Sequence, residues 1–225
     1  MRCSSNALQT DLFTRDSRNE PTSPVILGPG AVLLRGFALH DAESLLDAVA
    51  RIARAAPFRF MQTPGGFRMS ASMTNAGAAG WVSDRRGYRY DARDPDSGKP
   101  WPKLPAAFTT LAGAAATAAR FEGFVPDACL INRYEPGARL SLHQDKNERD
   151  FSQPIVSLSL GLPAVFLFGG LTRTDTPRRV RLEHGDVAVW GGPSRLAFHG
   201  IAPLKDGEHP ATGRCRINVT LRRAL

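Results

Sequence analysis

Residues 155–170 read IVSLSLGLPAVFLFGG, two short apolar runs separated by glycine and proline. Runs of this length, bounded by turn residues, are typical of buried β-strands. Similar runs fill the chain from residue 128 onward: ACLINRY (128–134), IVSLSLG (155–161), AVFLFGG (164–170), RRVRL (178–182), DVAVWGG (186–192), RLAFHG (195–200) and CRINVTLRR (215–223). A series of short strands with turn residues between them predicts an antiparallel sandwich or barrel.

Two helices are expected before these strands. Between residues 41 and 56, apolar residues recur at the spacing of one helix face, at Leu45, Leu46, Val49, Ile52 and Ala53. Asp41 can serve as the N-cap of this helix, and Pro57 ends it. The second helix opens at Pro105 and continues through the alanine-rich LAGAAATAARF at 111–121. Helices followed by short strands predict an α+β fold, with a jelly-roll core and the helices backing one sheet.

The length and composition fit one domain, because 225 residues with 42% hydrophobic residues can bury a single sizeable core. Residues 1–22 are polar and lack periodicity, so we expect a flexible tail followed by a single domain at 23–225. Between 57 and 102, glycines interrupt short polar and aromatic pieces, which predicts an irregular, mobile surface layer. The sequence shows neither a membrane-spanning apolar run nor a secretory signal, so a cytoplasmic location is expected.

The cysteines and the net charge narrow the function classes. Cys3, Cys129 and Cys215 are odd in number and form no C-x-x-C pair, so neither a disulfide framework nor a thiolate zinc site is indicated. The apolar flanks of Cys129 and Cys215 predict core thiols. Twenty-nine Lys and Arg against twenty-one acids give a formal charge of +8. This charge favours an anionic partner such as nucleic acid, with simple solubility as the alternative.

Two histidines and an aspartate form a candidate metal site. His143 and Asp145 are two residues apart, so on a strand both side chains would project from the same face. His199 ends the apolar run RLAFHG, where a neighbouring barrel strand could bring it alongside. Two imidazoles and one carboxylate form the facial triad typical of non-haem Fe(II) oxygenases. His184 and His209 are rival ligands, but their turn-like surroundings suit solvent-exposed positions better.

The last predicted strand supports this interpretation. Arg216, Asn218, Thr220 and Arg222 follow one another at intervals of two, so they share one face. An unpaired buried arginine would be very costly, and a guanidinium can hold a carboxylate through two parallel hydrogen bonds. An inward-facing Arg216 therefore implies a bound dicarboxylate.

Together these segments resemble the AlkB family of DNA and RNA repair dioxygenases. The resemblance rests on PDACLINRYEPGARLSLHQDKNE, PIVSLSLGLPAVFLFGG, LEHGDVAVWGG, RLAFHGI and CRINVTLRR, and upstream on PFRFMQTPGGFRMSASMTNAGAAGW. It implies a double-stranded β-helix core at 128–225 within the single domain, with His143, Asp145 and His199 as catalytic iron ligands. It also implies Fe(II), O2 and the cosubstrate 2-oxoglutarate, whose contacts fall on Asn132, Tyr134, Arg216, Asn218 and Arg222.

The same resemblance implies that residues 57–102 form a nucleotide-recognition lid over the barrel mouth. Trp81 would stack on a flipped base with the His143 ring opposite. Four further side chains would hold the phosphate backbone: Tyr88, Arg89, Tyr90 and Arg173. The simpler alternatives are a core role for Trp81 and a solvated basic face for Arg85, Arg86, Arg89 and Arg93.

The implied function is oxidative demethylation of 1-methyladenine and 3-methylcytosine in single-stranded DNA, with RNA as a further candidate, releasing formaldehyde, succinate and CO2. We expect a monomer that needs no obligate protein partner. In the best-known member of the family the residue two after the metal-binding aspartate is an acid, whereas this chain has Asn147, which we expect to favour cationic adducts less strongly. The alternatives are a dioxygenase that hydroxylates a protein or a small molecule, and a non-catalytic nucleic-acid binding module.

Overall fold

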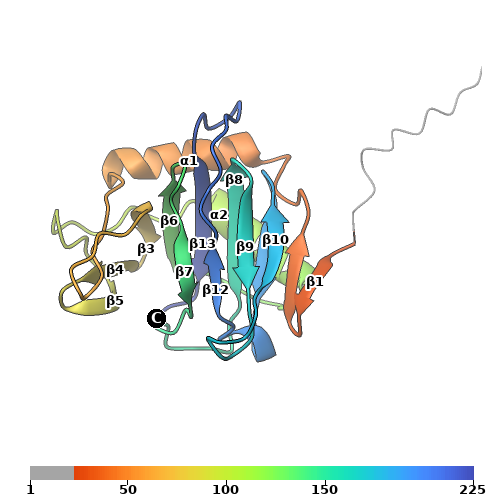
Figure 1. Ribbon diagram of the computed structural model, residues 1–225. Helices are drawn as coiled ribbons and strands as arrows, with labels where there is room; N and C mark the ends of the chain where they lie inside the picture. The colour runs from red at the N-terminus through yellow and green to blue at the C-terminus, as the bar shows by residue number, and fades with distance from the viewer. Residues whose placement is uncertain (1–22) are drawn as a thin grey trace, which may run out of the picture.

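The structure is a computed structural model that describes residues 23–225, so the tail predicted at 1–22 lies outside the described residues. Two antiparallel sheets form its core (Figure 1). The larger sheet contains, in spatial order, β1 (Val25–Gly28), β2 (Ala31–Leu34), β11 (Val187–Trp190), β8 (Ile155–Gly161), β13 (Arg216–Arg222), β6 (Ala128–Tyr134) and β3 (Ser72–Gly77). The smaller sheet contains β10 (Arg178–Leu182), β9 (Ala164–Phe168), β12 (His199–Ile201) and β7 (Leu140–His143). The predicted jelly-roll core is confirmed.

Both predicted helices back the larger sheet. They are α1 (Ala42–Ala55) and α2 (Ala106–Ala118), and Figure 1 shows them on the side of this sheet away from the smaller one. Asp41 occupies the N-cap position of α1, but its side chain makes no capping hydrogen bond. The apolar face of each helix packs against the larger sheet in one buried cluster with residues such as Leu158 and Val219.

The strands at the centre of the larger sheet are buried on both faces, although β8 and β13 alternate apolar with polar residues. In β13, Val219 and its alternate neighbours pack toward the helices, while Arg216, Asn218, Thr220 and Arg222 lie on the opposite face, toward the smaller sheet. A second apolar cluster fills much of the space between the sheets and includes Tyr134, Trp190, Phe166 and Phe168. The polar face of β13 therefore lines the interior of the jelly roll.

The expectation of an irregular layer at 57–102 was wrong in part. This segment contains β3, which joins the larger sheet, and the hairpin of β4 (Gly80–Asp84) and β5 (Gly87–Asp91). Asn75 in β3 explains why the polar sequence still forms ordered structure: its side chain accepts from the Trp81 amide and donates to the Trp81 carbonyl, each at 3.0 Å. These bonds add to ordinary backbone pairing, of β3 with β6 and of β4 with β5, so buried polar residues conceal the strands from an apolar pattern.

Three further strands and one boundary also differ from the sequence predictions. β1, β2 and β7 have only four residues each, too short to give a clear alternation. The run RLAFHG is not one strand, because it follows a short 3-10 helix (Gly192–Ser194) and turns before β12 begins. His199 therefore starts its strand instead of ending it. Cys129 and Cys215 are buried free thiols, as predicted.

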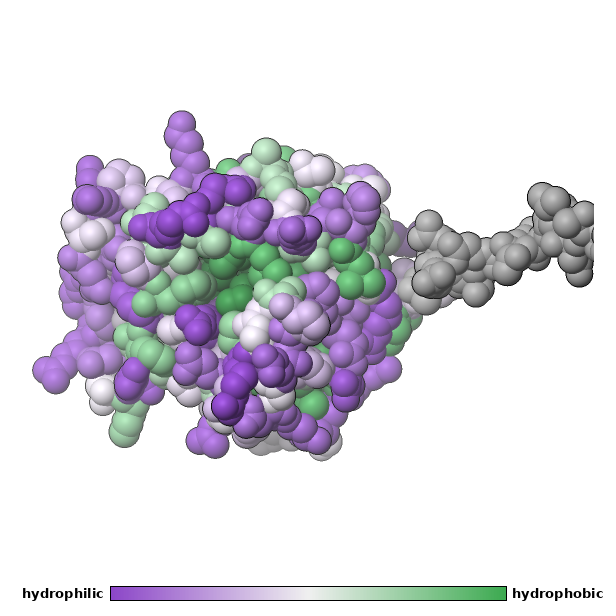
Figure 2. All heavy atoms as spheres, turned by 90° about the horizontal axis from the view of Figure 1, so that it is seen from above, coloured by the Kyte–Doolittle hydropathy of each residue, from purple (hydrophilic) through white to green (hydrophobic). Residues whose placement is uncertain are grey.

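The surface is largely polar. Figure 2 views the end drawn uppermost in Figure 1 and shows hydrophilic residues surrounding a smaller apolar hollow. Among the described residues, no helix has both the length and the apolar character needed to cross a membrane.

Candidate metal and cosubstrate site

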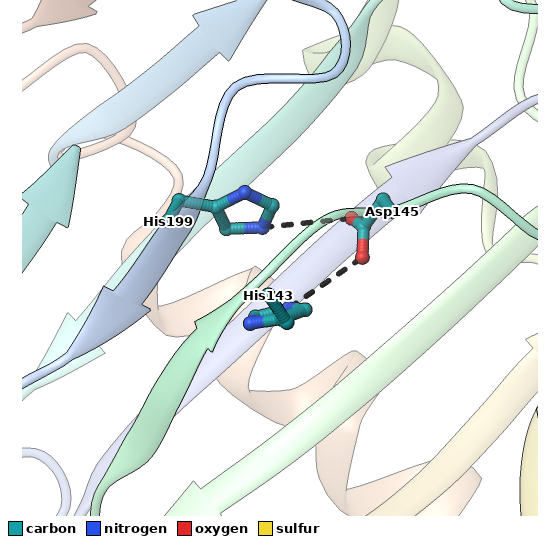
Figure 3. A group of neighbouring side chains, drawn as sticks. All are labelled: His143, Asp145 and His199. Atoms are coloured by element: carbon teal, nitrogen blue, oxygen red, sulfur yellow. Dashed lines mark ion pairs between the residues drawn. The ribbon is translucent and has the colours of Figure 1, made fainter. Parts of the chain in front are cut away.

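His143, Asp145 and His199 meet at one end of the smaller sheet. His143 ends β7 and pairs in register with His199, the first residue of β12, so the antiparallel ladder places the two imidazoles side by side. Asp145 lies in the loop after β7, not on the strand as the two-residue spacing had suggested. The three side chains still converge (Figure 3), and their potential ligand atoms lie within 4.8 Å of one another.

Backbone carbonyls orient both imidazole rings. The Nδ1 atom of His143 lies 3.0 Å from the Ser141 carbonyl oxygen, and that of His199 lies 3.0 Å from the Ala197 carbonyl oxygen. A carbonyl oxygen can only accept, so each Nδ1 carries the proton and each Nε2 keeps its lone pair. Burial, together with the neighbouring His143, lowers the pKa of His199 to about 4, which keeps this ring neutral near neutral pH. Both Nε2 atoms are therefore available to a metal ion.

Asp145 is held as a carboxylate by Arg222. The Nε and Nη2 atoms of Arg222 donate to Oδ2 of Asp145 at 2.9 and 2.6 Å. Burial alone would raise the pKa of Asp145, but the Arg222 guanidinium outweighs it and holds the pKa well below its usual range. One anionic and two neutral ligands that leave other coordination positions open fit Fe(II). Within residues 23–225 this is the only such group of three.

A second feature of the interior is the buried side chain of Arg216. It is 1% exposed, and its Nη2 donates to the Ser159 hydroxyl at 2.9 Å. Its Nε and Nη1 atoms have no hydrogen-bond partner, and neither does the buried Tyr134 hydroxyl. Burial lowers the pKa of Arg216, and no carboxylate among the described residues pairs with it. Two unpaired guanidinium donors beside a free hydroxyl fit a carboxylate of 2-oxoglutarate.

The other predicted cosubstrate residues surround this position. In the register of β6 with β13, Tyr134 lies opposite Arg216. Two residues further along the same face, Asn132 lies opposite Asn218. The Asn218 side chain donates to the Ser157 hydroxyl at 2.8 Å and to the Leu158 carbonyl at 2.9 Å. Arg222 lies at the metal end of the same strand face, where its charge is already paired with Asp145.

Trp81 from β4 and Asn147 from the loop after β7 are in contact. The indole nitrogen of Trp81 donates to the Asn147 side-chain oxygen at 3.1 Å. Trp81 is half-buried and stacks on Tyr88, with ring centroids 5.5 Å apart and an angle of 15° between the planes. Residues of the predicted lid therefore reach a point two residues from the ligand Asp145.

The three remaining predicted substrate residues have different surroundings. The Tyr90 hydroxyl donates to buried Glu148 at 2.6 Å, so it faces inward and not toward a phosphate at the surface. Arg89 makes a two-point ion pair with Asp84, at 3.0 and 3.1 Å. Arg173 is exposed and lies over the Phe198 ring, next to His199, with its charge free for an anion. Their contacts with phosphates remain predictions.

Four side chains near the site were missed from the sequence. Ser157 and Ser159 could have been found, because they are the polar members of the alternating run IVSLSLG and face Asn218 and Arg216. Glu148 and Arg195 form a buried ion pair at 3.2 Å behind the metal ligands. Their neighbourhoods in the sequence resemble ordinary charged loops, so no local pattern marks them.

The rival histidines lie away from the triad and contact each other. The rings of His184 and His209 stack with centroids 4.5 Å apart. The Gly161 amide donates to Nδ1 of His184 at 2.9 Å. Both rings are half-buried, contrary to the exposed positions expected, because each packs on the other.

The two-sheet fold, the triad and the unpaired arginine define a class of protein, and comparison with known sequences agrees. Residues 30–222 match the family model of the 2OG-Fe(II) oxygenase superfamily. This class uses Fe(II), 2-oxoglutarate and O2, which are the groups that the site's donor set fits.

Similarity to individual proteins identifies the family within this class. The chain is 60% identical to "Alpha-ketoglutarate-dependent dioxygenase AlkB" of Salmonella typhimurium, over 88% of this chain and 92% of that protein. It is 35% identical to "Nucleic acid dioxygenase ALKBH1" of Mus musculus over 57% of this chain and 33% of that protein. "The structure of OsALKBH1" has a TM-score of 0.79 and 31% identity, covering 89% of this chain and 99% of that one. The chain belongs to the AlkB family.

The stacked histidines should make stability depend on pH. Burial, together with His209, lowers the pKa of His184 below its ordinary value of about 6.5, so below that pH the unfolded chain binds the proton more readily. The contribution of neutral His184 to the free energy of unfolding should therefore be fully present above about pH 6.5 and be lost as the pH falls below that value. His184→Asn keeps an acceptor for the Gly161 amide. Between pH 7.5 and 5 its free energy of unfolding, measured by urea denaturation, should fall less than that of the unchanged chain. Exposed His40→Asn is the control, and an equal loss in both variants would contradict the prediction.

Proposed function

We propose that this protein oxidatively demethylates bases in single-stranded DNA, and also in RNA, as a cytoplasmic monomer. The observation that carries the proposal is the contact between Trp81 and Asn147, two residues from the ligand Asp145. An aromatic ring beside an iron centre supplies a stacking face for a base taken out of its strand. The names of the similar proteins, an AlkB dioxygenase and a nucleic acid dioxygenase, support the same substrate class.

The cosubstrate would be held at the Arg216 end of the interior. Arg216 and the Tyr134 hydroxyl would bind one carboxylate, and Asn132 and Asn218 would line the space between it and the metal. Arg222 would act at the other end by keeping Asp145 ionised and in place. When bound, Fe(II), 2-oxoglutarate and O2 would supply the oxidising chemistry that removes an N-methyl group as formaldehyde, with succinate and CO2 as the other products.

The chain's own residues select and orient the base. Trp81, supported by the stacked Tyr88, would stack on the extruded base, with the His143 ring on its other side. A base methylated on its pairing edge costs less to extrude, because it no longer pairs well. The exposed Arg173 would contact a neighbouring phosphate, and Arg89 would do so after leaving Asp84.

The direct test is formaldehyde release from single-stranded DNA that contains 1-methyladenine or 3-methylcytosine. The protein is reconstituted with Fe(II) without oxygen and then supplied with 2-oxoglutarate and air, and the Asp145→Ala variant is the control. We expect formaldehyde in proportion to the lesion with the unchanged chain and a loss of at least about 100-fold in the variant. Succinate production without formaldehyde, in protein that holds iron, would point instead to a protein or small-molecule hydroxylase.

Arg216→Gln should weaken 2-oxoglutarate binding. The substitution removes a charge-assisted pair worth about 3 kcal/mol or more, so the dissociation constant should rise by about 100-fold or more. Without 2-oxoglutarate the variant should melt no lower than the unchanged chain, because Arg216 is a buried charge without an anionic partner. Arg133→Gln, on the outward face of β6, is the matched control. Equal dissociation constants for the two variants would rule out the assigned role.

Asn147→Asp should increase the preference for cationic lesions. Asn147 is exposed, so an added carboxylate attracts a cationic base by only about 0.5–1 kcal/mol, or roughly two- to five-fold. The measurement is the ratio of kcat/KM for 1-methyladenine to that for a neutral etheno adduct. Asn147→Ala, which removes the amide without adding charge, should not raise this ratio. If the ratio is unchanged in Asn147→Asp, charge at this position does not select the lesion.

A further inference from the structure

The position of Asp145 needs an explanation beyond the sheet. His143 and His199 are fixed relative to each other by the pairing of β7 with β12. β7 ends at His143, and Asp145 has no strand partner. Arg222 holds its carboxylate, but a side-chain contact alone leaves the backbone of the loop free to move. The metal-binding loop, which we define as residues 144–153, must therefore be held by other contacts.

One backbone bond, from the Arg149 amide to the Ala224 carbonyl, holds the middle of the loop. Arg195 makes three further contacts, one with each nitrogen of its guanidinium. Nη1 donates to the Asp145 carbonyl at 2.9 Å, Nε donates to the Gln153 carbonyl at 2.9 Å, and Nη2 forms an ion pair with Glu148 at 3.2 Å. The side chain is 3% exposed, and the Phe151 ring covers it, with Cζ 5.3 Å from the ring centroid. One residue thus joins the start, the middle and the end of the metal-binding loop.

The segment that carries Arg195 also positions His199. The Ser194 hydroxyl donates to the Pro29 carbonyl at 2.7 Å, which anchors the segment to the turn between β1 and β2. The Ala197 carbonyl fixes the His199 ring. In the reverse direction, the Gln144 side chain donates to the Leu196 carbonyl at 2.7 Å. The metal-binding loop and the segment at 194–199 are therefore connected from both sides.

The charges in this region balance. Arg195 and Arg222 face Asp145 and Glu148, and Glu148 lies 3.4 Å from the Nε atom of Arg222 as well. Glu148 also accepts the hydroxyl of Tyr90. Buried charges are tolerated when they are paired and hydrogen-bonded. Lysine could not replace Arg195, because a single ammonium cannot reach three acceptors that a planar fork spans.

We propose that Arg195 is a positioning residue for the metal centre. It fixes the backbone of Asp145 against the segment that carries His199, so that the carboxylate and both imidazoles already face one ion before the metal binds. It acts through Asp145 and does not touch substrate or cosubstrate. Preorganisation of this kind raises metal affinity, since the loop need not be ordered on binding. The proposal concerns the metal alone, so it can fail while the proposed function stands, and the reverse.

The test measures metal affinity without nucleic acid or turnover. Metal-free full-length protein is titrated with Co(II) as the probe, and the absorption spectrum reports both the dissociation constant and the coordination of the ion. Arg195→Lys should bind Co(II) about 10- to 100-fold more weakly, as expected when support for a metal ligand is removed. Its Co(II) spectrum should also change, because Asp145 is no longer held in place. Arg149→Lys, an exposed arginine of the same loop, should match the unchanged chain.

Melting temperatures of the metal-free proteins separate positioning from general stability. We expect Arg195→Lys to melt within a few degrees of the unchanged chain. Gln144→Met, which removes only the contact with Leu196, should weaken Co(II) several-fold, and it replaces Arg195→Lys as the test if that variant does not fold. An unchanged affinity and spectrum in the folded variant would overturn the proposal. A spectrum that is unchanged while affinity and melting temperature fall together would also overturn it, because Arg195 would then serve only packing.

Discussion

The structure depends on the burial of a polar strand face between two sheets. On β13 the side chains of Arg216, Asn218, Thr220 and Arg222 occupy the interior, where a sandwich normally places apolar residues. Each such group must find a partner or cost free energy. Asp145 satisfies Arg222, and Ser157 satisfies part of Asn218. The Arg216 donors that remain unpaired are the part of this core that the protein does not complete by itself, and they fit a carboxylate of the proposed cosubstrate.

This constraint also explains how the two ends of the site divide their work. Arg216 stands at the start of β13 and Arg222 at its end, so one strand face spans the interior from the proposed cosubstrate site to the candidate metal site. The two residues have the same side chain but different partners. Arg222 meets an anion of the protein, whereas Arg216 has none among the described residues. The sequence alone places both arginines on one face of the same strand and does not show which of them has an anionic partner within the protein.

Much of the fold could be predicted because many strands form short runs bounded by turn residues, α1 has strong apolar periodicity, and the alanine-rich α2 has high helix propensity. The polar residues at intervals of two in β13 predict a polar strand face, which the structure places in the interior. The three predicted metal ligands do converge, but the premise that His143 and Asp145 share a strand face was wrong, since Asp145 lies in the loop after β7. The strands within residues 57–102 could not be predicted in the same way, since β3 buries the polar residues Ser72, Thr74 and Asn75 and so lacks an apolar pattern. Glu148 and Arg195 are invisible for a different reason: their partners are backbone carbonyls and charges distant in the sequence.

The pairing of Asp145 with Arg222 finally limits how the carboxylate can act. Arg222 donates both of its hydrogen bonds to Oδ2. Among residues 23–225, the nitrogen that faces Oδ1 is Nε2 of His143, 3.6 Å away. With the proton of His143 on Nδ1, that Nε2 is itself an acceptor and leaves Oδ1 without a donor. A carboxylate with one oxygen neutralised in this way offers its other oxygen to a cation. Asp145 is therefore prepared as a ligand through one oxygen, which leaves coordination positions for the cosubstrate and O2.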